Sequence, residues 1–515
     1  MSESDNRRQL AAVLEDELYN YCSSDSLSEI SLHEIIKRHG LESNNDSQTR
    51  NYEFFFAACR NERVTEGIIQ CLLEYFPDAA SATNGVGSSP LHYVCDNNSA
   101  TPNIVKLLIE GAPESVRSVT DKGRMPLHIL CRNSSVDEAA AIKIMNSLIE
   151  KYPEAVQCAD NEGDLPIHLA CYASKSPEFC RVLIDAYPGS EQITDAKGVL
   201  PLHYACTNGS LATVKYVYHL YPDAIGHATD GGYPIHAAIA GYPQLRGNPA
   251  VAVKIVKFLL NCDPDVKLPT YKGASLLYYA CRKEYNDSTI ESSLQIITAI
   301  YNTHPEAIED SRIARNIYRY HQQVQAIINN ELVYARQAKD LRMMTTRDDN
   351  GQLPLHRALQ NKATLGSIKL LVKGNHGALQ SPDSSGALPA HIACQHHNST
   401  DVIQYLLGLD PSTLEAVDRD GNTALHLACR CAKYETIELL LESYDAVSVS
   451  RKNTNKNLPI ELLWESNAVE DRESIEYTES VFRLLQAHPE TLMNNYADGT
   501  VSRVGVCSKN EKKRV

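Results

Sequence analysis

The chain has 515 residues, 43% of them hydrophobic, and its 64 acidic and 49 basic residues give a net charge of −15. This composition is that of a folded protein with a large core. The acidic balance excludes general electrostatic binding to nucleic acid or anionic membranes, although it leaves room for a local basic patch. No stretch approaches the roughly 18–20 consecutive apolar residues of a membrane span.

The N-terminal sequence MSESDNRRQL is polar and lacks the apolar segment of a secretory signal. Fifteen cysteines without such a signal predict reduced thiols rather than a disulfide framework. We therefore expect a soluble intracellular protein, cytoplasmic with a nuclear location left open. Residues 1–50 are acidic and rich in Ser and Asn, with helical spacing of apolar residues only at 10–21 and 32–41. We expect this N-terminal segment to be partly disordered.

From about residue 51 a short phrase recurs along the chain. It reads SSPLHYVC at 88–95, GDLPIHLAC at 163–171 and GVLPLHYAC at 198–206. The histidines that set its register are His92, His128, His168, His203, His236, His356, His391 and His426. With Tyr278 and Glu461 in the same slot, the intervals are 36, 40, 35, 33, 42, 78, 35, 35 and 35 residues. Repetition at a nearly fixed period predicts an array of stacked repeats.

Each unit has the same order of elements. A turn such as DNEG at 160–163 comes first, and a Pro follows at the first turn of a short helix. A second apolar stretch with helical spacing, such as 182–184, often ends at a Pro, as at Tyr187-Pro188. One unit holds too few apolar residues to fold alone, so neighbouring units must stack around a continuous core.

A turn ending in Gly, then Pro-Leu-His-x-Ala, then an apolar second helix, resembles the ankyrin repeat. The resemblance covers about residues 51–495 and implies an all-α solenoid of stacked helix-turn-helix units. The period here is mostly 35 rather than the family's roughly 33 residues, because the second helix ends in Tyr/Phe-Pro-Glu/Asp-Ala. The residue before the Pro is usually Leu, Ser or Tyr in place of Thr. The extra residues are expected to lengthen the loop before the next turn.

The longest interval, between Tyr278 and His356, contains a stretch at 311–344 without Gly or Pro. Its apolar residues follow a coiled-coil a/d pattern that Glu331 interrupts: Ile313, Ile317, Tyr320, Val324 and Ile327, then Tyr334, Ala338 and Leu341. We predict one or two helices without a repeat's turn. The predicted domains are the N-terminal segment 1–50, an N-terminal repeat block 51–306, a basic helical insert 307–347, a C-terminal repeat block 348–495 and a disordered basic tail 496–515.

The insert is the one segment with a strongly basic charge. Between residues 311 and 347, seven cations against Glu331 and Asp340 give a net charge of +5. The cations are Arg312, Arg315, Arg319, Arg336, Lys339, Arg342 and Arg347. The favoured interpretation is a helix that lies on the array and pairs with its own acidic neighbours. The alternative is a docking helix for an acidic partner.

The regular His and Cys residues suggest a metal site, but their spacing argues against one. Eight cysteines follow the register slot by three residues: Cys59, Cys95, Cys131, Cys171, Cys206, Cys281, Cys394 and Cys429. Equivalent positions on stacked helices lie about 8–10 Å apart, whereas zinc needs thiolates within about 2.3 Å. We therefore expect the cysteines to fill the core and the histidines to bond the backbone of their own or the adjacent turn. No nucleophile elbow, phosphate loop or zinc-protease motif is present, so we predict no catalytic activity and no cofactor.

A stacked array exposes its turn tips and the outward side of each first helix as one extended surface. In ankyrin-repeat proteins, which this chain resembles, such residues contact partner proteins. The candidates at matching positions are Asp121, Arg124, Arg132, Asn161, Glu162, Asp164, Tyr172, Lys197, Thr207, Arg282, Gln395 and Arg430. The sequence therefore predicts a non-enzymatic scaffold or adaptor, with Tyr and Arg as the main energetic anchors. The alternative is a regulator of transcription or nucleic-acid transactions that acts through the basic insert.

Overall fold

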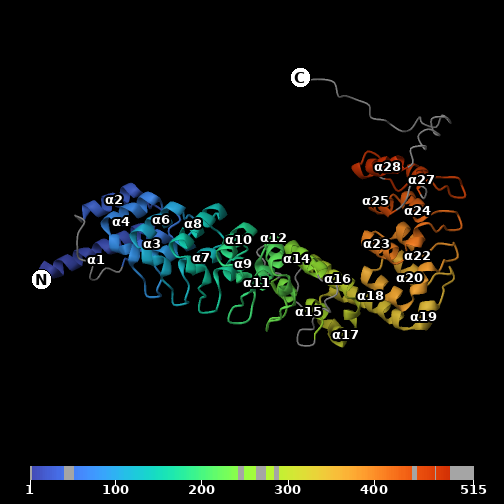
Figure 1. Ribbon diagram of the computed structural model, residues 1–515, viewed down its shortest axis with the longest axis horizontal. Coiled ribbons are helices and arrows are strands. Elements are labelled where there is room, and N and C mark those ends of the chain that lie inside the picture. Colours follow the sequence, from blue (N-terminus) through green and yellow to red (C-terminus); the bar gives the residue numbers. More distant parts are fainter. Residues whose placement is uncertain are drawn as a thin grey trace, which may run out of the picture. The chain divides into compact units, whose positions relative to one another are not determined.

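The computed structural model describes residues 3–39, 52–241, 249–262, 274–282, 289–443, 449–469 and 471–487. Across these ranges the chain is helical, and the only β-type pairing is an isolated bridge between Thr229 and Gly232. The predicted all-α solenoid of stacked helix-turn-helix units is confirmed (Figure 1). The chain forms two compact units: unit 1 comprises Met1–Gly273 and Asn286–Ile296, and unit 2 comprises Ala274–Tyr285 and Ile297–Val515.

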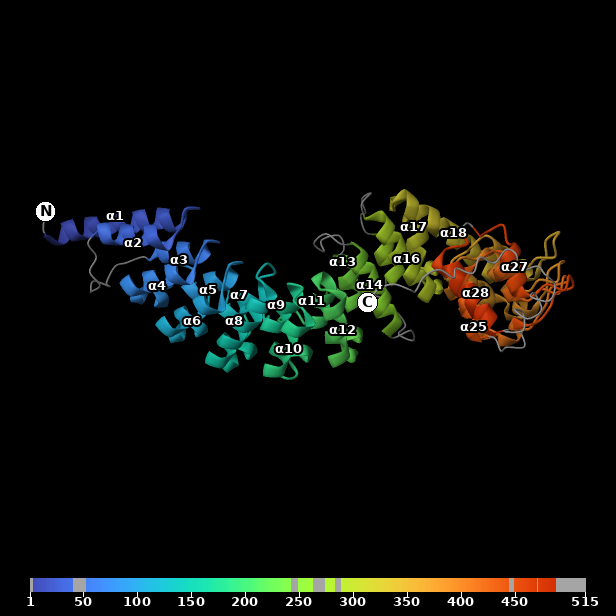
Figure 2. The ribbon, with the colours of Figure 1, turned by 90° about the horizontal axis from the view of Figure 1, so that it is seen from above.

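Unit 1 is built from two rows of helices, inner and outer, which Figure 2 separates. The inner row, the first helices of the repeats, contains α3 (Glu53–Arg60), α5 (Pro90–Asp96), α7 (Pro126–Arg132), α9 (Pro166–Tyr172), α11 (Pro201–Asn208) and α13 (Pro234–Gly241). The outer row contains α4 (Glu66–Tyr75), α6 (Pro102–Gly111), α8 (Glu138–Lys151), α10 (Pro177–Ala186), α12 (Leu211–Leu220) and α14 (Pro249–Cys262). Each inner helix packs on the next inner helix and on its own outer helix.

The described part of the N-terminal segment, residues 3–39, contains two helices. Residues 3–38 form α1 (Glu3–Cys22) and α2 (Glu29–Arg38), which pack on α3 and α4 as an additional helix pair at the start of the array. Leu14 and Leu18 of α1 and Leu32 and Ile36 of α2 are buried. These i, i+4 pairs form apolar stripes that cover the first repeat. Residues 40–51 lie outside the described residues.

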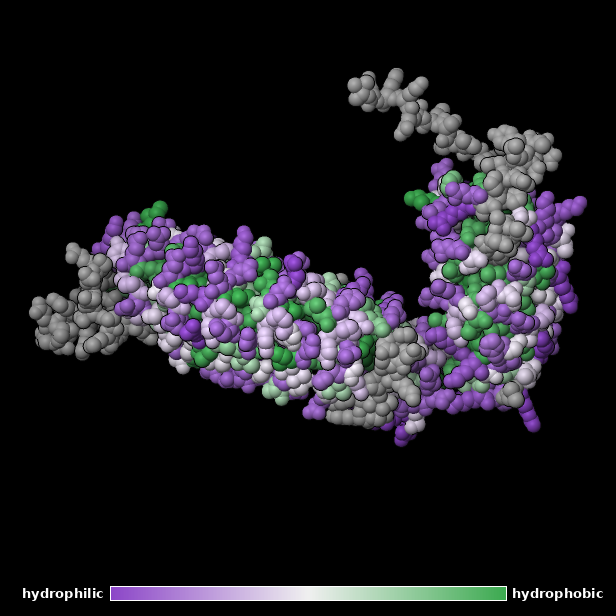
Figure 3. Space-filling view, in the orientation of Figure 1, coloured by the Kyte–Doolittle hydropathy of each residue, from purple (hydrophilic) through white to green (hydrophobic). Residues whose placement is uncertain are grey.

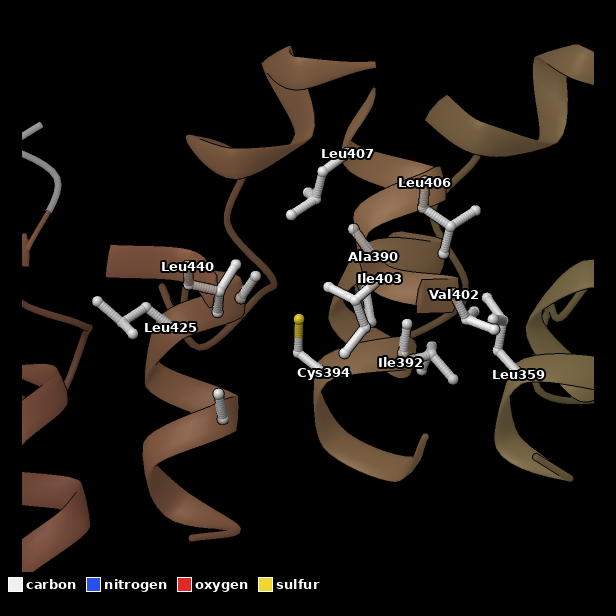
Figure 4. Packing of buried hydrophobic residues seen from close by; sticks show 14 of the residues in the cluster. Leu359, Ala390, Ile392, Cys394, Val402, Ile403, Leu406, Leu407, Leu425 and Leu440 are labelled. Atoms are coloured by element: carbon white, nitrogen blue, oxygen red, sulfur yellow. The ribbon is translucent and has the colours of Figure 1, made fainter. Parts of the chain in front are cut away.

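Unit 2 continues the same pattern. Its helices are α15 (Leu276–Cys281), the end of α16 (Ile290–Thr303), α17 (Ser311–Asn316), α18 (Gln322–Lys339), α19 (Leu341–Thr345), α20 (Pro354–Gln360), α21 (Leu365–Gly374), α22 (Pro389–His396), α23 (Thr400–Leu409), α24 (Ala424–Arg430), α25 (Tyr434–Ser443), α27 (Pro459–Glu465) and α28 (Ile475–Ala487). Figure 4 shows Leu359, Ile392, Cys394 and Leu425 of successive inner helices within one buried cluster. The predicted tail 496–515 lies outside the described residues.

The predicted insert is a repeat that has lost its histidine and cysteine. Ser275 caps α15 and Asp310, 35 residues later, caps α17; the N–H of Ser275 donates to Asp310 Oδ2 at 3.0 Å. Ile313 occupies the histidine slot and is buried. The outer helix α18 then packs on α21, the outer helix of the next repeat. The sequence predicted helices without a repeat's turn; the structure shows a repeat because stacking needs buried apolar side chains rather than the His itself.

The register of α18 also differs from the predicted coiled-coil pattern. Val324, Ile328, Glu331 and Ala335 are buried, whereas Ile327 is only half-buried. This spacing is that of a straight helix with 3.6 residues per turn packed on one neighbour. Glu331 therefore does not interrupt the buried face, since Thr364 Oγ1 donates to its Oε2 at 2.9 Å and Ser367 Oγ donates to the same atom. The division between the two compact units falls within residues 274–297.

The 35-residue period has a structural cause at the end of the outer helices. A short 3-10 turn begins there, in most repeats at the predicted Pro, as in η1 (Pro77–Ser81), η3 (Pro153–Gln157) and η5 (Pro222–Gly226). Pro suits this position because its ring fixes φ and it has no N–H to satisfy. The turn brings two buried residues, such as Ala155 and Val156, under the next repeat. The extra length is therefore part of the core.

Candidate binding surface

The turn tips before the inner helices are joined to one another by backbone hydrogen bonds. The N–H of Asn161 donates to Lys122 O at 3.0 Å, and the N–H of Ala196 donates to Glu162 O at 3.1 Å. Gly163 has φ of +83°, and a Cβ there would lie 2.4 Å from Ala196 N. Only Gly fits this left-handed and crowded position. The tips therefore form a rigid ladder, and in Figure 1 they project from one side of unit 1 as a row of loops.

Five of the eight register histidines bond the backbone at both ring nitrogens. In α7, the N–H of Met125 donates to His128 Nδ1 at 3.2 Å, and His128 Nε2 contacts Cys158 O of the next repeat at 3.0 Å. His92, His168, His391 and His426 make the same two contacts. In His236 and His356, Nδ1 accepts the corresponding N–H. Burial lowers the pKa of His128 and His203 to about 4, so these imidazoles are neutral at pH 7.

Glu461 shows what the histidine slot requires. Its Oε2 accepts the N–H of Leu458 at 2.7 Å, which is the bond that Nδ1 makes in the other repeats. The slot therefore serves as a helix cap.

The eight periodic cysteines are all buried. Burial raises the pKa of Cys59 and Cys206 well above the ordinary thiol value and that of Cys394 to about 12. Such thiols stay protonated and behave as small apolar residues. Throughout the part of the chain that the structure describes, no group of three or more His, Cys, Asp or Glu residues is arranged to hold a metal ion.

Two of the twelve predicted contact residues are buried, which corrects their prediction as exposed contacts. Arg124 is 8% exposed, and its Nε donates to Asp160 Oδ2 of the next repeat at 2.8 Å. Asp164 is 4% exposed, and burial raises its pKa to about 6. At Asp160, burial acts to raise the pKa, but hydrogen bonds from Arg124 and from backbone N–H groups outweigh it and hold the pKa below its usual value. The Arg124–Asp160 pair therefore stabilises the turn tips, whereas the ionised form of Asp164 is disfavoured there.

The other ten candidates lie at two places in the repeats. Asp121, Asn161, Glu162 and Lys197 are exposed at the turn tips of unit 1. Arg132, Tyr172 and Thr207 of unit 1, and Arg282, Gln395 and Arg430 of unit 2, lie at the ends of inner helices. Thr207 and Gln395 are half-buried, and the Thr207 hydroxyl donates to His203 O at 2.9 Å. In Figure 3, polar side chains cover most of the visible face of each unit, with apolar ones scattered between them.

Tyr172 and Arg132 are the most prominent of these side chains. Tyr172 is 44% exposed and packs edge-to-face on Tyr204, with 6.1 Å between ring centroids. Arg132, at the end of the neighbouring helix α7, is exposed and has no ion pair among the described residues. A Tyr held on a second ring beside an Arg is a common anchor of protein interfaces.

Sequence reasoning missed three basic residues at or just after the ends of inner helices of unit 2. Lys362, His396 and Lys433 lie at the ends of α20, α22 and α24, and Arg430 is beside them. They were not predicted because each belongs to a different repeat and lies one to three residues after the helix-end position at which Gln395 and Arg430 were chosen. A comparison of the residues just after each inner helix would have found them.

The basic segment at 307–347 contributes some of its cations to contacts within the chain. Lys339 Nζ lies 3.1 Å from Glu309 Oε1, and Arg312 lies 5.9 Å from the centre of the Tyr278 ring. Arg347 donates to the carbonyl of Pro382 at 2.7 Å. Arg336 and Arg342 are exposed.

The comparisons with known proteins agree with this geometry. A family model described as ankyrin repeats in three copies matches residues 138–225, 318–414 and 355–453, and a model of the single ankyrin repeat matches 86–120. The second of these ranges begins inside the predicted insert, as expected for a degenerate repeat. No curated protein matches the chain. No described helix is both long enough and apolar enough to cross a membrane. Together the matches cover just over half of the chain, which therefore belongs to the ankyrin-repeat family of protein-interaction modules.

Proposed function

We propose that this protein is a non-enzymatic intracellular scaffold or adaptor that binds partner proteins through its turn tips and inner-helix ends. The observation that carries the proposal is the pair Arg132 and Tyr172, which stand exposed on adjacent inner helices. Arg124, Asp160 and the register histidines already hold the frame, so this pair is not needed for folding. An exposed aromatic residue on a rigid frame loses little entropy on binding.

The test is affinity capture from native lysate with the full chain and two charge-reversal variants. The double variant Arg132→Glu/Tyr172→Glu alters the proposed face, and Lys143→Glu alters the exposed side of outer helix α8 as a matched control. We expect a set of proteins that the wild type and the control capture and the double variant does not. Melting temperatures of all three proteins should agree, since the changed side chains are exposed. Equal capture by the double variant would remove this face as the binding site.

Contacts that the basic segment at 307–347 makes within the chain favour the scaffold over the nucleic-acid regulator. Lys339 pairs with Glu309 and Arg312 lies near Asp310, so carboxylates of the same segment offset part of the positive charge that would have to neutralise phosphates. Each phosphate contact adds to the salt dependence of binding, so a regulator acting here should show a strongly salt-sensitive gel shift on duplex DNA or RNA. The scaffold proposal expects no shift at low salt.

A further inference from the structure

Unit 2 carries a basic ridge, which we define as Lys362, His396, Arg430 and Lys433. These residues stand at the same ends of three consecutive inner helices, α20, α22 and α24, each of which packs on the next. Lys362 and Arg430 are exposed, and His396 and Lys433 are half-buried. Three consecutive repeats therefore place basic side chains along one edge of a chain whose net charge is −15, and the first and third of them supply the permanent cations.

The backbone beneath the ridge is fixed by hydrogen bonds between repeats. His397 Nε2 contacts Ala363 O of the preceding repeat at 2.8 Å, and Ser466 Oγ donates to Arg430 O at 2.6 Å. The Lys433 ammonium donates to Asn398 Oδ1, which also comes from the preceding repeat. The backbone positions that carry the ridge side chains are thus set by the fold, so a ligand would meet them on a rigid frame.

The cations of the ridge are not neutralised by carboxylates. Among the described residues of unit 2, the ion pairs involve other side chains, and none joins Lys362, Arg430 or Lys433 to an Asp or Glu. Burial, followed by the charges of Lys362, Lys433 and Arg430, lowers the pKa of His396. Asp401 and Glu435 begin the outer helices α23 and α25, but neither forms an ion pair with the ridge.

Lys362 has a backbone conformation that disfavours lysine. Its φ is +55°, and the N–H of Ala363 donates to Ala358 O at 2.9 Å, a helix-ending motif in which Gly is the ordinary residue. A side chain in this left-handed region is strained relative to Gly. The fold would accept Gly at this position, so the lysine contributes charge at some cost in stability.

We propose that the basic ridge binds a short acidic peptide segment of a partner protein. This inference rests on the proposed function, because it names the partner chemistry for the part of the face that lies in unit 2. Three helix ends about 10 Å apart span about 20 Å, which an extended peptide covers with about six residues. Three permanent cations are few for a nucleic-acid site, since binding that contacts only about three phosphates is weak at physiological salt.

The experiment is a fluorescence-anisotropy titration of the full chain at low salt. The probe is a fluorescein-labelled peptide of about twelve residues in which Glu alternates with Ser, long enough to cross the ridge with a margin at each end. A single-stranded oligonucleotide of similar length is the second probe. The ridge variants are Lys362→Gly and Arg430→Gln/Lys433→Gln. Lys373→Gln, an exposed cation on outer helix α21, is the control for net charge.

We expect the acidic peptide to bind the wild type and Lys373→Gln equally, and Arg430→Gln/Lys433→Gln at least about tenfold more weakly, the loss of two close charge contacts. Lys362→Gly should weaken binding by a smaller factor while keeping the melting temperature at or above that of the wild type. The chemical shift of the His396 ring should show a rise in its pKa when the peptide binds, because an anion favours the imidazolium.

Three results would overturn this inference: no peptide binding at low salt, equal binding by the ridge variant, or tighter binding of the oligonucleotide than of the peptide. The first two leave the proposed function standing if the Arg132→Glu/Tyr172→Glu variant still loses its captured proteins. If that capture is unaffected while the peptide does bind the ridge, the face in unit 1 fails and the ridge remains.

Discussion

The turn tips of unit 1 and the basic ridge of unit 2 both contain several charged side chains. Charges of opposite sign pair with one another in the tips, whereas the ridge cations have no carboxylate partner among the residues that the structure describes. In the tips, Arg124 is buried against Asp160 and lies 3.7 Å from Glu162, so its charge is matched within the chain. In the ridge, Lys362 and Arg430 are exposed and face no carboxylate within ion-pair distance in the described part of unit 2. The same repeat frame thus supports charges that hold neighbouring repeats together and charges that are open to a partner.

This difference separates two roles of charged residues, stabilising the fold and binding a partner, which the sequence alone does not distinguish. A buried charge pair contributes to folding, because removing one partner leaves the other without solvent or counter-ion. An exposed, unpaired cation contributes little to folding and keeps its charge for a ligand. Changes at the tips should therefore alter stability, and changes at the ridge should alter binding.

The largest expected effect is at the tip. Arg124→Ala leaves the Asp160 carboxylate buried without its cation and should destabilise unit 1 by about 3 kcal/mol. Lys197→Ala removes an exposed cation 3.7 Å from Glu162 and should change stability by less than about 0.5 kcal/mol. Thermal unfolding monitored by circular dichroism measures both. Equal melting temperatures for the two variants would show that the buried Arg124–Asp160 pair contributes no more to folding than an exposed cation does.

The next effect tests whether the neutral register histidines stabilise the fold, as the buried charge pair of the tips does. His168→Leu leaves the N–H of Leu165 and the carbonyl of Ile193 without their bonds. Each lost partner of a buried group costs about 1 kcal/mol or more, so we expect about 2 kcal/mol of destabilisation by urea unfolding. A variant as stable as the wild type would show that the cap can be dispensed with.

Asp164 makes the stability of unit 1 depend on pH, and the direction of its pKa shift gives the sign. Burial raises its pKa to about 6, above the ordinary value of 3.8, so its contribution to stability is present below pH 4 and is lost as the pH rises through 6. Asp164→Asn should therefore raise the stability of unit 1 at pH 7.5 by about 2 kcal/mol and flatten its increase between pH 7 and pH 5. Melting temperatures across this range test it. A destabilised variant at pH 7.5 would mean that the ionised carboxylate is favourable in its site.

The smallest effect belongs to the ridge. Lys362→Gly should raise stability by about 1 kcal/mol, because Gly adopts a φ of +55° without strain. Ala432, with φ of +50° at the equivalent position of a later repeat, offers a control: Ala432→Gly should stabilise by a similar amount without removing charge. Loss of stability in Lys362→Gly alone would assign the lysine a structural role and weaken the distinction between ridge and tips.

Sequence periodicity could predict the frame because each slot has one local task. The Pro that begins the inner helix, the His that caps it and the buried Cys each depend on neighbours within a few residues or in the same slot of the next unit, so their pattern repeats. The degenerate repeat at 310–345 could be predicted in part: Ile313 stands 35 residues after Tyr278, but with His and Cys gone only the interval remained to identify it.

The roles of individual charges could not be predicted because they depend on pairs from different repeats. Nothing within its own unit distinguishes the buried Arg124 from the exposed Arg132, since Asp160 comes from the following repeat. The ridge has the same origin, with one or two residues from each of three units. Its left-handed Lys362 also depends on where helix α20 ends, which the sequence places only to within a few residues.

Structural and partner-binding charges are separated by measuring the melting temperature and the affinity for the acidic peptide on two variants. We predict that Arg124→Ala lowers the melting temperature of unit 1 and leaves peptide binding unchanged. Arg430→Gln/Lys433→Gln should keep the melting temperature and lose most of the binding. If both variants lose stability and binding together, or if the ridge variant binds as the wild type does, the separation of structural from partner-binding charge is contradicted.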